Sequence, residues 1–214
     1  MKHTTIYFFR HGKIDNPKKV FYGRHLPMQL STEGVQKVAK VARKLRDQGV
    51  RIDMMYTSPL HRAVTTAELL ASILHISTTV QLDKLTDVHI PSLAGKPLRL
   101  RAEIHKTGID EYSGKYADAG HETRADIVKR MYAVVQKILR EHKGRTVGIV
   151  SHGDSLRFLL FQLLCKNKQI PSMGELKTIY YPPKGEGWKM TFDEKGNIRK
   201  AQLLPNGEDL AIQY

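Results

Sequence analysis

The 214-residue sequence predicts an α/β fold: a single three-layer domain with a mainly parallel sheet, helices on both faces and a C-terminal β-hairpin. Short apolar runs alternate along the chain with longer segments in which apolar residues recur with helical spacing. Strands that alternate with helices form right-handed crossover units, so the strands lie parallel and the helices cover both faces. No internal repeat and no Pro/Gly/Ser-rich linker divides the chain, which favours one domain.

The first strand and the first helix are predicted near the N-terminus. Thr4–Phe9 (TTIYFF) is a compact β-prone run, and an irregular stretch follows over 12–30. A helix is expected next, because apolar residues share one face, Ser31 or Thr32 can cap its start and Gly49 lies just beyond its end. The apolar residues of this helix are Val35, Val38, Ala39, Ala42 and Leu45.

The second strand is predicted over Asp53–Thr57. Ser58 is then expected to cap a helix with Pro59 at its first position, where proline costs nothing because its missing N–H would have no partner in any case. Apolar residues with helical spacing continue this helix over Leu60–Leu74. Val80–Leu82 predicts a short third strand.

The middle of the chain contains a long irregular stretch followed by the clearest strand. Residues 86–121 are expected to be mostly irregular, apart from a helix near 97–106, and so long a stretch inside a compact domain is usually functional or mobile. A helix from about Thr123 to His142 follows. Thr146–Val150 (TVGIV) is then a strand, and a leucine-rich helix over 156–164 comes after it.

The C-terminal part has a different pattern. The runs WKMTF and KAQLL flank the turn sequence DEKGN and predict the β-hairpin. We therefore expect one domain over 1–214, with a core at about 4–165 and a C-terminal extension at about 170–214.

The composition excludes several classes of protein. Hydrophobic residues at 41% and charged residues at 26% are ordinary for a globular domain, which argues against disordered and collagen-like chains. No apolar stretch approaches the length that crosses a membrane. The single cysteine, Cys165, excludes an intrachain disulfide framework and a cysteine-rich zinc site. We expect a cytoplasmic protein with no membrane partner.

The charge is strongly positive and uneven. The chain has 35 Lys and Arg against 21 Asp and Glu, a net charge of +14, and most of this excess lies in residues 1–50. Such an excess is compatible with a nucleic-acid partner, an anionic small molecule or a soluble surface. Nucleic acid is disfavoured, because no recognised binding module and no interleaving of aromatic with basic residues is present.

Arginine and histidine follow three of the predicted strands. Arg10-His11 comes directly after the first strand, Arg62 lies one turn into the helix after the second, and His152-Gly153 follows TVGIV. Ligands bind beyond the carboxyl ends of parallel strands, so these residues should converge. Arginine matches phosphate oxygens, an imidazole can attack phosphorus, and a helix N-terminus supplies amide donors. The set predicts a site for a phosphoryl group.

The segments FFRHG, TSPLHRAVTTAE and IVSHGDS resemble the signature of the histidine phosphatase superfamily, in the branch that includes cofactor-dependent phosphoglycerate mutase. The resemblance spans about 4–165 and extends to LSTEGVQ and GHET, which are similar to the family's L-T-x-x-G-x-Q and G-G-E-S. It implies that His11 is the nucleophile that becomes phosphohistidine. It also implies that Arg10, Arg62 and His152 hold the phosphoryl oxygens.

The same resemblance suggests the general acid. The family's L-x-E-x-x-x-G run corresponds to LTDVHIPSLAG here, which puts Asp87 at the acid position, one methylene shorter than the usual Glu. Glu122, in GHET, is expected to border the substrate entrance. Asp87 would protonate the leaving alkoxide while a phosphate dianion lies beside it, and would then activate the water that attacks phosphohistidine. No metal or cofactor is expected, because arginines supply the positive charge.

Several departures from the family pattern favour a phosphatase over a mutase. Lys13 follows R-H-G where an acidic or polar residue is usual, His121 replaces a glycine, and the consecutive arginines typical of mutases are absent from 88–125. A phosphorylated small molecule is the expected partner. A mutase, a non-catalytic phosphate-binding relative and a basic nucleic-acid binder remain as alternatives, and the substrate and the oligomeric state stay open.

Overall fold

A computed structural model of the chain describes residues 2–165, 176 and 179–210. Its strands are β1 (Thr4–Arg10), β2 (Met54–Thr57), β3 (Thr79–Gln81), β4 (Thr146–Ser151), β5 (Gly187–Phe192) and β6 (Ile198–Leu204). They form one six-stranded sheet in the order β3-β2-β4-β1-β5-β6. The first four strands in this order are parallel, whereas β5 pairs antiparallel with both β1 and β6.

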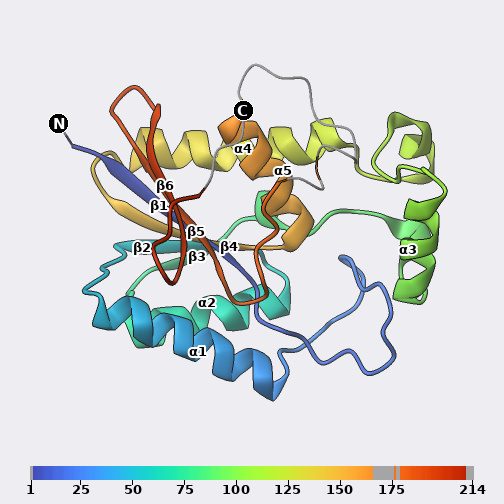
Figure 1. Ribbon diagram of the computed structural model, residues 1–214, viewed down its shortest axis with the longest axis horizontal. Helices are drawn as coiled ribbons and strands as arrows, with labels where there is room; N and C mark the ends of the chain where they lie inside the picture. The colour runs from blue at the N-terminus through green and yellow to red at the C-terminus, as the bar shows by residue number, and fades with distance from the viewer. Residues whose placement is uncertain (1, 166–175, 177–178, 211–214) are drawn as a thin grey trace.

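Helices cover both faces of this sheet, as the sequence predicts (Figure 1). They are α1 (Thr32–Asp47), α2 (His61–Leu74), α3 (Leu98–Lys106), α4 (Arg124–Glu141) and α5 (Gly153–Leu164). In Figure 1, α1 and α2 lie below the sheet, α4 and α5 lie above it, and α3 stands apart at the right. The predicted α/β fold with a mainly parallel sheet is confirmed.

The alternation of side chains along β1 explains the two layers of core. Ile6 and Phe8 point into the cluster formed with α4 and α5, whereas Tyr7 and Phe9 belong to the cluster formed with α1 and α2. Successive side chains of a strand point to opposite faces, so a continuous apolar run fits a strand that is covered on both sides. Phe8 and Phe9 are fully buried, and each contributes about 1.5–3 kcal/mol by burial alone.

Two helices begin at the residues that the sequence indicated. Ser31 is the N-cap of α1, and its hydroxyl accepts a hydrogen bond from the Gly34 amide at 3.1 Å. Thr123 caps α4 through a capping box with Asp126, in which each side chain accepts from the other residue's backbone amide. These caps fix where each helix leaves its loop, at a typical contribution of about 1 kcal/mol each.

The prediction for the start of α2 is wrong. This helix begins at His61 with Leu60 as its N-cap, so Pro59 lies outside it and Ser58 does not cap it. The Ser58 hydroxyl accepts instead from the Leu60 amide at 3.2 Å and forms a hydrogen bond with the His152 ring at 2.8 Å. Ser58 therefore bonds to His152, a residue distant in the sequence, instead of capping the helix that follows it.

The other expected elements need only small adjustments. The strand expected at Val80–Leu82 begins and ends one residue earlier, and the helix expected within 86–121 is α3. Short 3₁₀ turns add Asp83–Leu85, Pro91–Leu93 and Gly114–Ala119. No helix among the described residues combines the length and the apolarity needed to cross a membrane.

The predicted hairpin is confirmed and belongs to the same sheet as the core. β5 pairs along β1, with Gly187 opposite Phe9. A Cβ atom on Gly187 would lie 1.7 Å from the Phe8 carbonyl oxygen, so this close approach requires glycine. Parts of the predicted extension (170–175, 177–178 and 211–214) lie outside the described residues.

Candidate active site

The predicted site residues meet at the carboxyl ends of β1 and β4, which are neighbours in the sheet. Arg10 lies opposite Ser151 in the register, so the residues that follow each strand emerge side by side. The chain then turns to α1 below the sheet after β1, and to α5 above it after β4 (Figure 1). Connections that diverge to opposite faces leave a crevice at the strand ends, where ligands of such folds bind.

His11 is buried and is held in one orientation. Its Nδ1 lies 2.8 Å from the carbonyl oxygen of Gly12. Because a carbonyl only accepts, Nδ1 carries the proton and the lone pair of Nε2 is free. Burial holds the pKa of His11 well below its ordinary value, and the charges of His152, Arg62 and Arg10 lower it further. The imidazole is therefore a neutral nucleophile.

His152 lies beside His11, with 5.2 Å between the ring centroids. Its Nε2 forms a hydrogen bond with the Ser58 hydroxyl at 2.8 Å, and its Nδ1 lies 3.6 Å from Oδ2 of Asp87. Burial lowers the pKa of His152 well below its ordinary value, and the charge of Arg62 acts in the same direction. With a hydroxyl able to donate to Nε2, the neutral ring carries its proton on Nδ1.

Arg62 reaches the site from α2 and is only 1% exposed. Its Nη2 donates to the Gly23 carbonyl and to Oδ2 of Asp87, both at 2.8 Å. The guanidinium carbon lies 4.7 Å from the centroid of the Tyr22 ring. These contacts fix the plane of the guanidinium before any ligand binds.

Arg10 is fixed in a comparable way at the end of β1. Its Nη1 donates to the Pro182 carbonyl at 3.0 Å, and its guanidinium carbon lies 4.6 Å from the centroid of the Tyr181 ring. Gly153 allows this packing, because a Cβ atom there would lie 2.2 Å from the Tyr181 hydroxyl oxygen and 3.0 Å from the Arg10 guanidinium carbon. The predicted Gly153 is thus a close-packed residue of the site.

Three polar atoms of this cluster are buried without a hydrogen-bond partner among the described residues: Nε of Arg10, Nε of Arg62 and Nδ1 of His152. A buried donor without a partner costs about 1–3 kcal/mol. All three belong to side chains at His11, and all three can donate. A ligand with several acceptor oxygens, such as a phosphoryl group, would satisfy them together.

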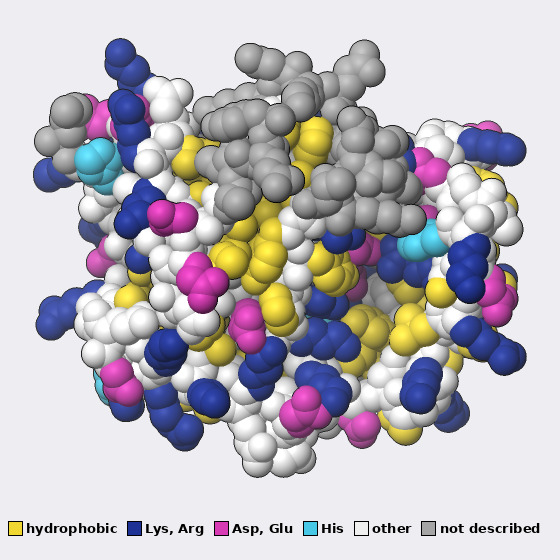
Figure 2. Space-filling view, viewed as in Figure 1, with side chains coloured by type: hydrophobic (Ala, Val, Ile, Leu, Met, Phe, Trp, Pro, Cys, Tyr) yellow, Lys and Arg dark blue, Asp and Glu magenta, His cyan; other side chains and the backbone are white. Residues whose placement is uncertain are grey.

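A cavity of about 220 Å³ opens over His11. Its lining includes Arg10, Gly153 and Asp87. The Asp87 carboxylate in turn contacts Arg62 at 2.8 Å and His152 at 3.6 Å. Figure 2 shows this face of the molecule, with Lys and Arg side chains gathered around a hollow to the right of centre. The remaining lining residues are His11, Asn16, Phe21, Tyr22, Gly23, Val88, Leu98, Arg101, Asp154, Tyr181 and Lys184.

Asp87, the predicted general acid, lines the cavity beside His11. Its Oδ1 accepts from the Val88 amide at 2.9 Å and its Oδ2 from Arg62 at 2.8 Å. Its carbonyl oxygen accepts from Arg24 Nε at 2.5 Å and from Arg130 Nη2 at 3.3 Å. Both the carboxylate and the backbone of this residue are therefore fixed at the cavity wall.

Glu122 does not line this cavity. Its carboxylate pairs with Arg24 at 2.7 Å and with Arg130 at 2.5 Å, and it also accepts from the His89 amide at 3.3 Å. The structure thus places Glu122 behind Asp87, between the two arginines that hold the Asp87 backbone. The contact of Glu122 with substrate stays a prediction from the sequence.

The comparisons with known proteins agree with this geometry. Residues 6–178 match the family model described as histidine phosphatase superfamily, branch 1. The chain belongs to this superfamily.

Individual relatives of this member of the superfamily include both mutases and phosphatases. The 2,3-bisphosphoglycerate-dependent phosphoglycerate mutase of Clavibacter michiganensis is 28% identical over 194 residues, covering 74% of this chain and 76% of the relative. The metal-independent phosphoserine phosphatase of Arabidopsis thaliana is 25% identical, covering 81% and 72%. The solved structure of Bacillus stearothermophilus YhfR superposes with a TM-score of 0.77 at 25% identity, covering 98% of this chain and all of that one.

The sequence did not indicate a second cluster of polar residues in the cavity. Arg101, on α3, donates through Nη2 to Oδ2 of Asp154 at 2.8 Å and to the Tyr112 hydroxyl at 2.7 Å. Tyr112 also donates to Asp154 at 2.6 Å. Although burial opposes it, Arg101 and Tyr112 hold the pKa of Asp154 well below its ordinary value. The ionised Asp154 therefore holds α3, through Arg101, at the wall of the cavity.

Some of these residues carried a signal in the sequence. Asp154 follows His152-Gly153 directly, in the same short segment as two predicted site residues. Arg157 lies one turn further along α5; it is half-buried, and its guanidinium carbon lies 4.6 Å from the centroid of the Tyr181 ring. Nothing in the pattern of α3 distinguished Arg101.

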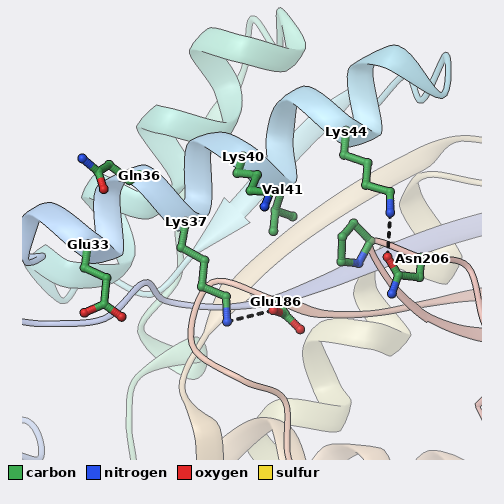
Figure 3. Close-up of a pocket in the computed structure, with 9 residues that line it drawn as sticks. Glu33, Gln36, Lys37, Lys40, Val41, Lys44, Glu186 and Asn206 are labelled. Atoms are coloured by element: carbon green, nitrogen blue, oxygen red, sulfur yellow. Dashed lines mark hydrogen bonds and ion pairs between the residues drawn. The ribbon is translucent and has the colours of Figure 1, made fainter.

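A second, larger pocket lies away from these residues (Figure 3). It measures about 570 Å³ and runs between α1 and the loop at Pro205 and Asn206. Lys37 pairs there with Glu186 at 2.8 Å, and Lys44 donates to Asn206 at 2.6 Å. This α1 groove, as we call it, contains no histidine. Among the described residues, no three His, Cys, Asp or Glu side chains are placed to share a metal ion.

Proposed function

We propose that the chain is a phosphatase that hydrolyses a phosphomonoester through a phosphohistidine at His11. One observation carries the proposal: three buried donors of Arg10, Arg62 and His152, the side chains whose charges act on His11, have no partner among the described residues, and the Nδ1–H of His11 bonds to the Gly12 carbonyl. This arrangement offers a nucleophile and an oxyanion site at the same place. The membership of the chain in the histidine phosphatase superfamily supports it.

The first step forms a bond between Nε2 of His11 and phosphorus while the ester P–O bond breaks. The three donors neutralise the charge on the phosphoryl oxygens, and the Gly12 carbonyl accepts from the Nδ1–H of His11 as the ring becomes cationic. The leaving oxygen takes its proton from Asp87. The phosphate dianion also attracts Arg62 and so competes with the Asp87 carboxylate, which pairs with Arg62 at 2.8 Å.

The second step is hydrolysis of the phosphohistidine. The Asp87 carboxylate takes a proton from water, the water oxygen bonds to phosphorus, and the P–N bond breaks. Inorganic phosphate leaves and His11 returns to its neutral form with the proton on Nδ1. Positioned donors and the buried guanidinium groups carry the charge in both steps, so we expect activity without an added metal or cofactor.

The test is hydrolysis of 4-nitrophenyl phosphate in the presence of EDTA. His11→Ala should reduce the rate to the uncatalysed level, and the wild type should form an acid-labile phosphoenzyme that the variant lacks. His75→Asn is a matched control, because His75 ends α2 in a left-handed conformation that asparagine tolerates. Full activity of His11→Ala would exclude the mechanism. A non-catalytic relative would bind vanadate without forming the phosphoenzyme.

Mutase activity is the second candidate, because bisphosphoglycerate-dependent mutases are among the relatives. A mutase would need a bisphosphate primer and would return an isomerised phosphoester instead of inorganic phosphate. The absence of consecutive arginines from 88–125 favours hydrolysis. A phosphorylated small-molecule substrate and a cytoplasmic location remain predictions.

A further inference from the structure

The loop that precedes β5 is bonded to the nucleophile's own strand end. On one side of Lys184, the Pro182 carbonyl accepts from Arg10 Nη1 at 3.0 Å. On the other side, the Gly185 amide donates to the carbonyl oxygens of Arg10 and His11, at 3.2 and 3.1 Å. The backbone that carries Lys184 is therefore fixed relative to His11, and its side chain lines the cavity.

The charge of Lys184 has no counterion in the described part of the chain. Its side chain is half-buried and lines the cavity, and it forms no ion pair with any described carboxylate. Neighbouring Lys13, by contrast, is paired with Glu33. Burial lowers the pKa of Lys184, and the charges of Arg10, Lys13 and Arg62 lower it further; Glu33, which pairs with Lys13, opposes them without outweighing them. An anion at this position would relieve an unfavourable concentration of positive charge.

The other positive charges of the cavity are matched by the proposed phosphoryl group or by carboxylates of the chain. Arg10 and Arg62 have free donors for the phosphoryl group. Arg101 is matched by Asp154 and by Glu111, each at 2.8 Å. Lys184 is therefore a positive charge in excess of what a phosphoryl group needs.

Lys184 also lies where the cavity continues into a second hollow. A groove of about 690 Å³, lined mainly by residues of the 12–30 stretch, shares Asn16, Leu98 and Lys184 with the catalytic cavity. A phosphomonoester with its phosphoryl group at His11 can extend its leaving group past these shared residues into the groove. The ammonium group of Lys184 would lie beside the path of that leaving group.

We propose that Lys184 binds a second anionic group, a carboxylate or a phosphate, carried by the leaving group of the substrate. The inference rests on the proposed phosphatase function and narrows it to phosphomonoesters with an additional negative charge. It assigns substrate specificity to the loop before β5.

The test uses pairs of substrates that differ only in the second anion. Glycerol 3-phosphate and 3-phosphoglycerate differ by a carboxylate, and fructose 6-phosphate and fructose 1,6-bisphosphate differ by a phosphate. The wild type should prefer the acidic member of one pair by about tenfold in kcat/KM, the effect of one charge pair worth about 1.4 kcal/mol. The pair that shows the preference identifies the anion as carboxylate or phosphate.

Variants then locate the preference. In Lys184→Met the ratio of kcat/KM between acidic and neutral members should fall to near 1, mainly through KM for the acidic member. Lys184→Arg should keep the ratio, because it keeps the charge. Lys40→Met removes the same charge from the α1 groove and should leave the ratio unchanged. An unchanged ratio in Lys184→Met, or no preference in the wild type for either acidic member, would overturn the inference.

A binding measurement separates this inference from the proposed reaction. Calorimetric titration of His11→Ala with both members of each pair does not depend on turnover. The affinity ratio should again favour the acidic member and should be lost in the His11→Ala, Lys184→Met double variant. If the wild type forms no phosphoenzyme but this binding ratio behaves as expected, the phosphatase proposal fails and the anion subsite stands.

Discussion

The cavity over His11 and the α1 groove are both rich in positive charge, but they hold it in different ways. Arg10 and Arg62 are fixed by carbonyl groups and aromatic rings, and each has a buried donor without a partner among the described residues. Lys37 and Lys44 are partly exposed and already satisfied by Glu186 and Asn206 (Figure 3). The cavity over His11, although smaller than the α1 groove, is therefore the better anion site. Buried donors without partners favour binding of an anion, whereas volume and net charge alone do not.

The largest expected effect comes from removing one fixed arginine. Arg62→Gln should lower kcat/KM for 4-nitrophenyl phosphate by about 10²–10³, the usual loss for one oxyanion donor. Stopped-assay kinetics checks this, and circular dichroism confirms that the variant is folded. Arg62→Lys should recover little, since lysine lacks the planar fork whose Nη2 reaches Gly23 and Asp87 on one side and leaves Nε for a phosphoryl oxygen. A loss below threefold in Arg62→Gln would remove the distinction between cavity and groove.

Acid should destabilise the protein through the two histidines of the cavity. Burial lowers the pKa of His11 and of His152 well below 6.5, so in the acidic range the unfolded chain binds protons that the native state does not. Stability is therefore lost as the pH falls below about 6.5, with a slope of up to about 1.4 kcal/mol per pH unit for each histidine. Urea unfolding between pH 7 and 5 measures this slope.

The control for the acid effect is a direct titration of the rings. Chemical shifts of the imidazole carbons should show His11 and His152 neutral at pH 6. The kcat/KM profile should accordingly lack an acid limb near 6.5 from the nucleophile. Protonation of His11 near pH 6.5 would contradict both expectations.

Arg130 provides a test of how the acid is positioned. It donates to the carbonyl oxygens of Lys84, Thr86 and Asp87 and to the Ser155 hydroxyl, so it fixes the backbone beside the carboxylate. Arg130→Met should lower kcat about tenfold for an alkyl phosphate and less for 4-nitrophenyl phosphate, whose leaving group needs little protonation. KM should change little for either substrate. Equal losses on both substrates would show a general structural defect instead of a misplaced acid.

The residues of the candidate site could be predicted from the sequence because they follow strands directly. His11 and His152 each come one residue after a strand that its apolar run defines, and the ends of neighbouring parallel strands must meet. Ser58 was misjudged because its partner, His152, is 94 residues away along the chain. Lys184 was not found because it lies in a loop, and Arg101 because its helix, α3, lies within a long irregular stretch. Long-range hydrogen bonds, which leave no periodic pattern in the sequence, bring both residues to the cavity.

The smallest effect is expected in the α1 groove. Lys37→Met removes a partly exposed ion pair with Glu186, and such pairs contribute about 0–1 kcal/mol to stability. At physiological ionic strength kcat/KM should change less than twofold, because the Debye length of about 8 Å screens an exposed charge at longer range. At low ionic strength a small decrease for anionic substrates is expected if the N-terminal excess of positive charge steers them. A tenfold loss of kcat/KM in Lys37→Met at physiological salt would instead show that the α1 groove takes part in substrate binding. The distinction between a cavity that needs an anion and a groove that does not would then fail at Lys37.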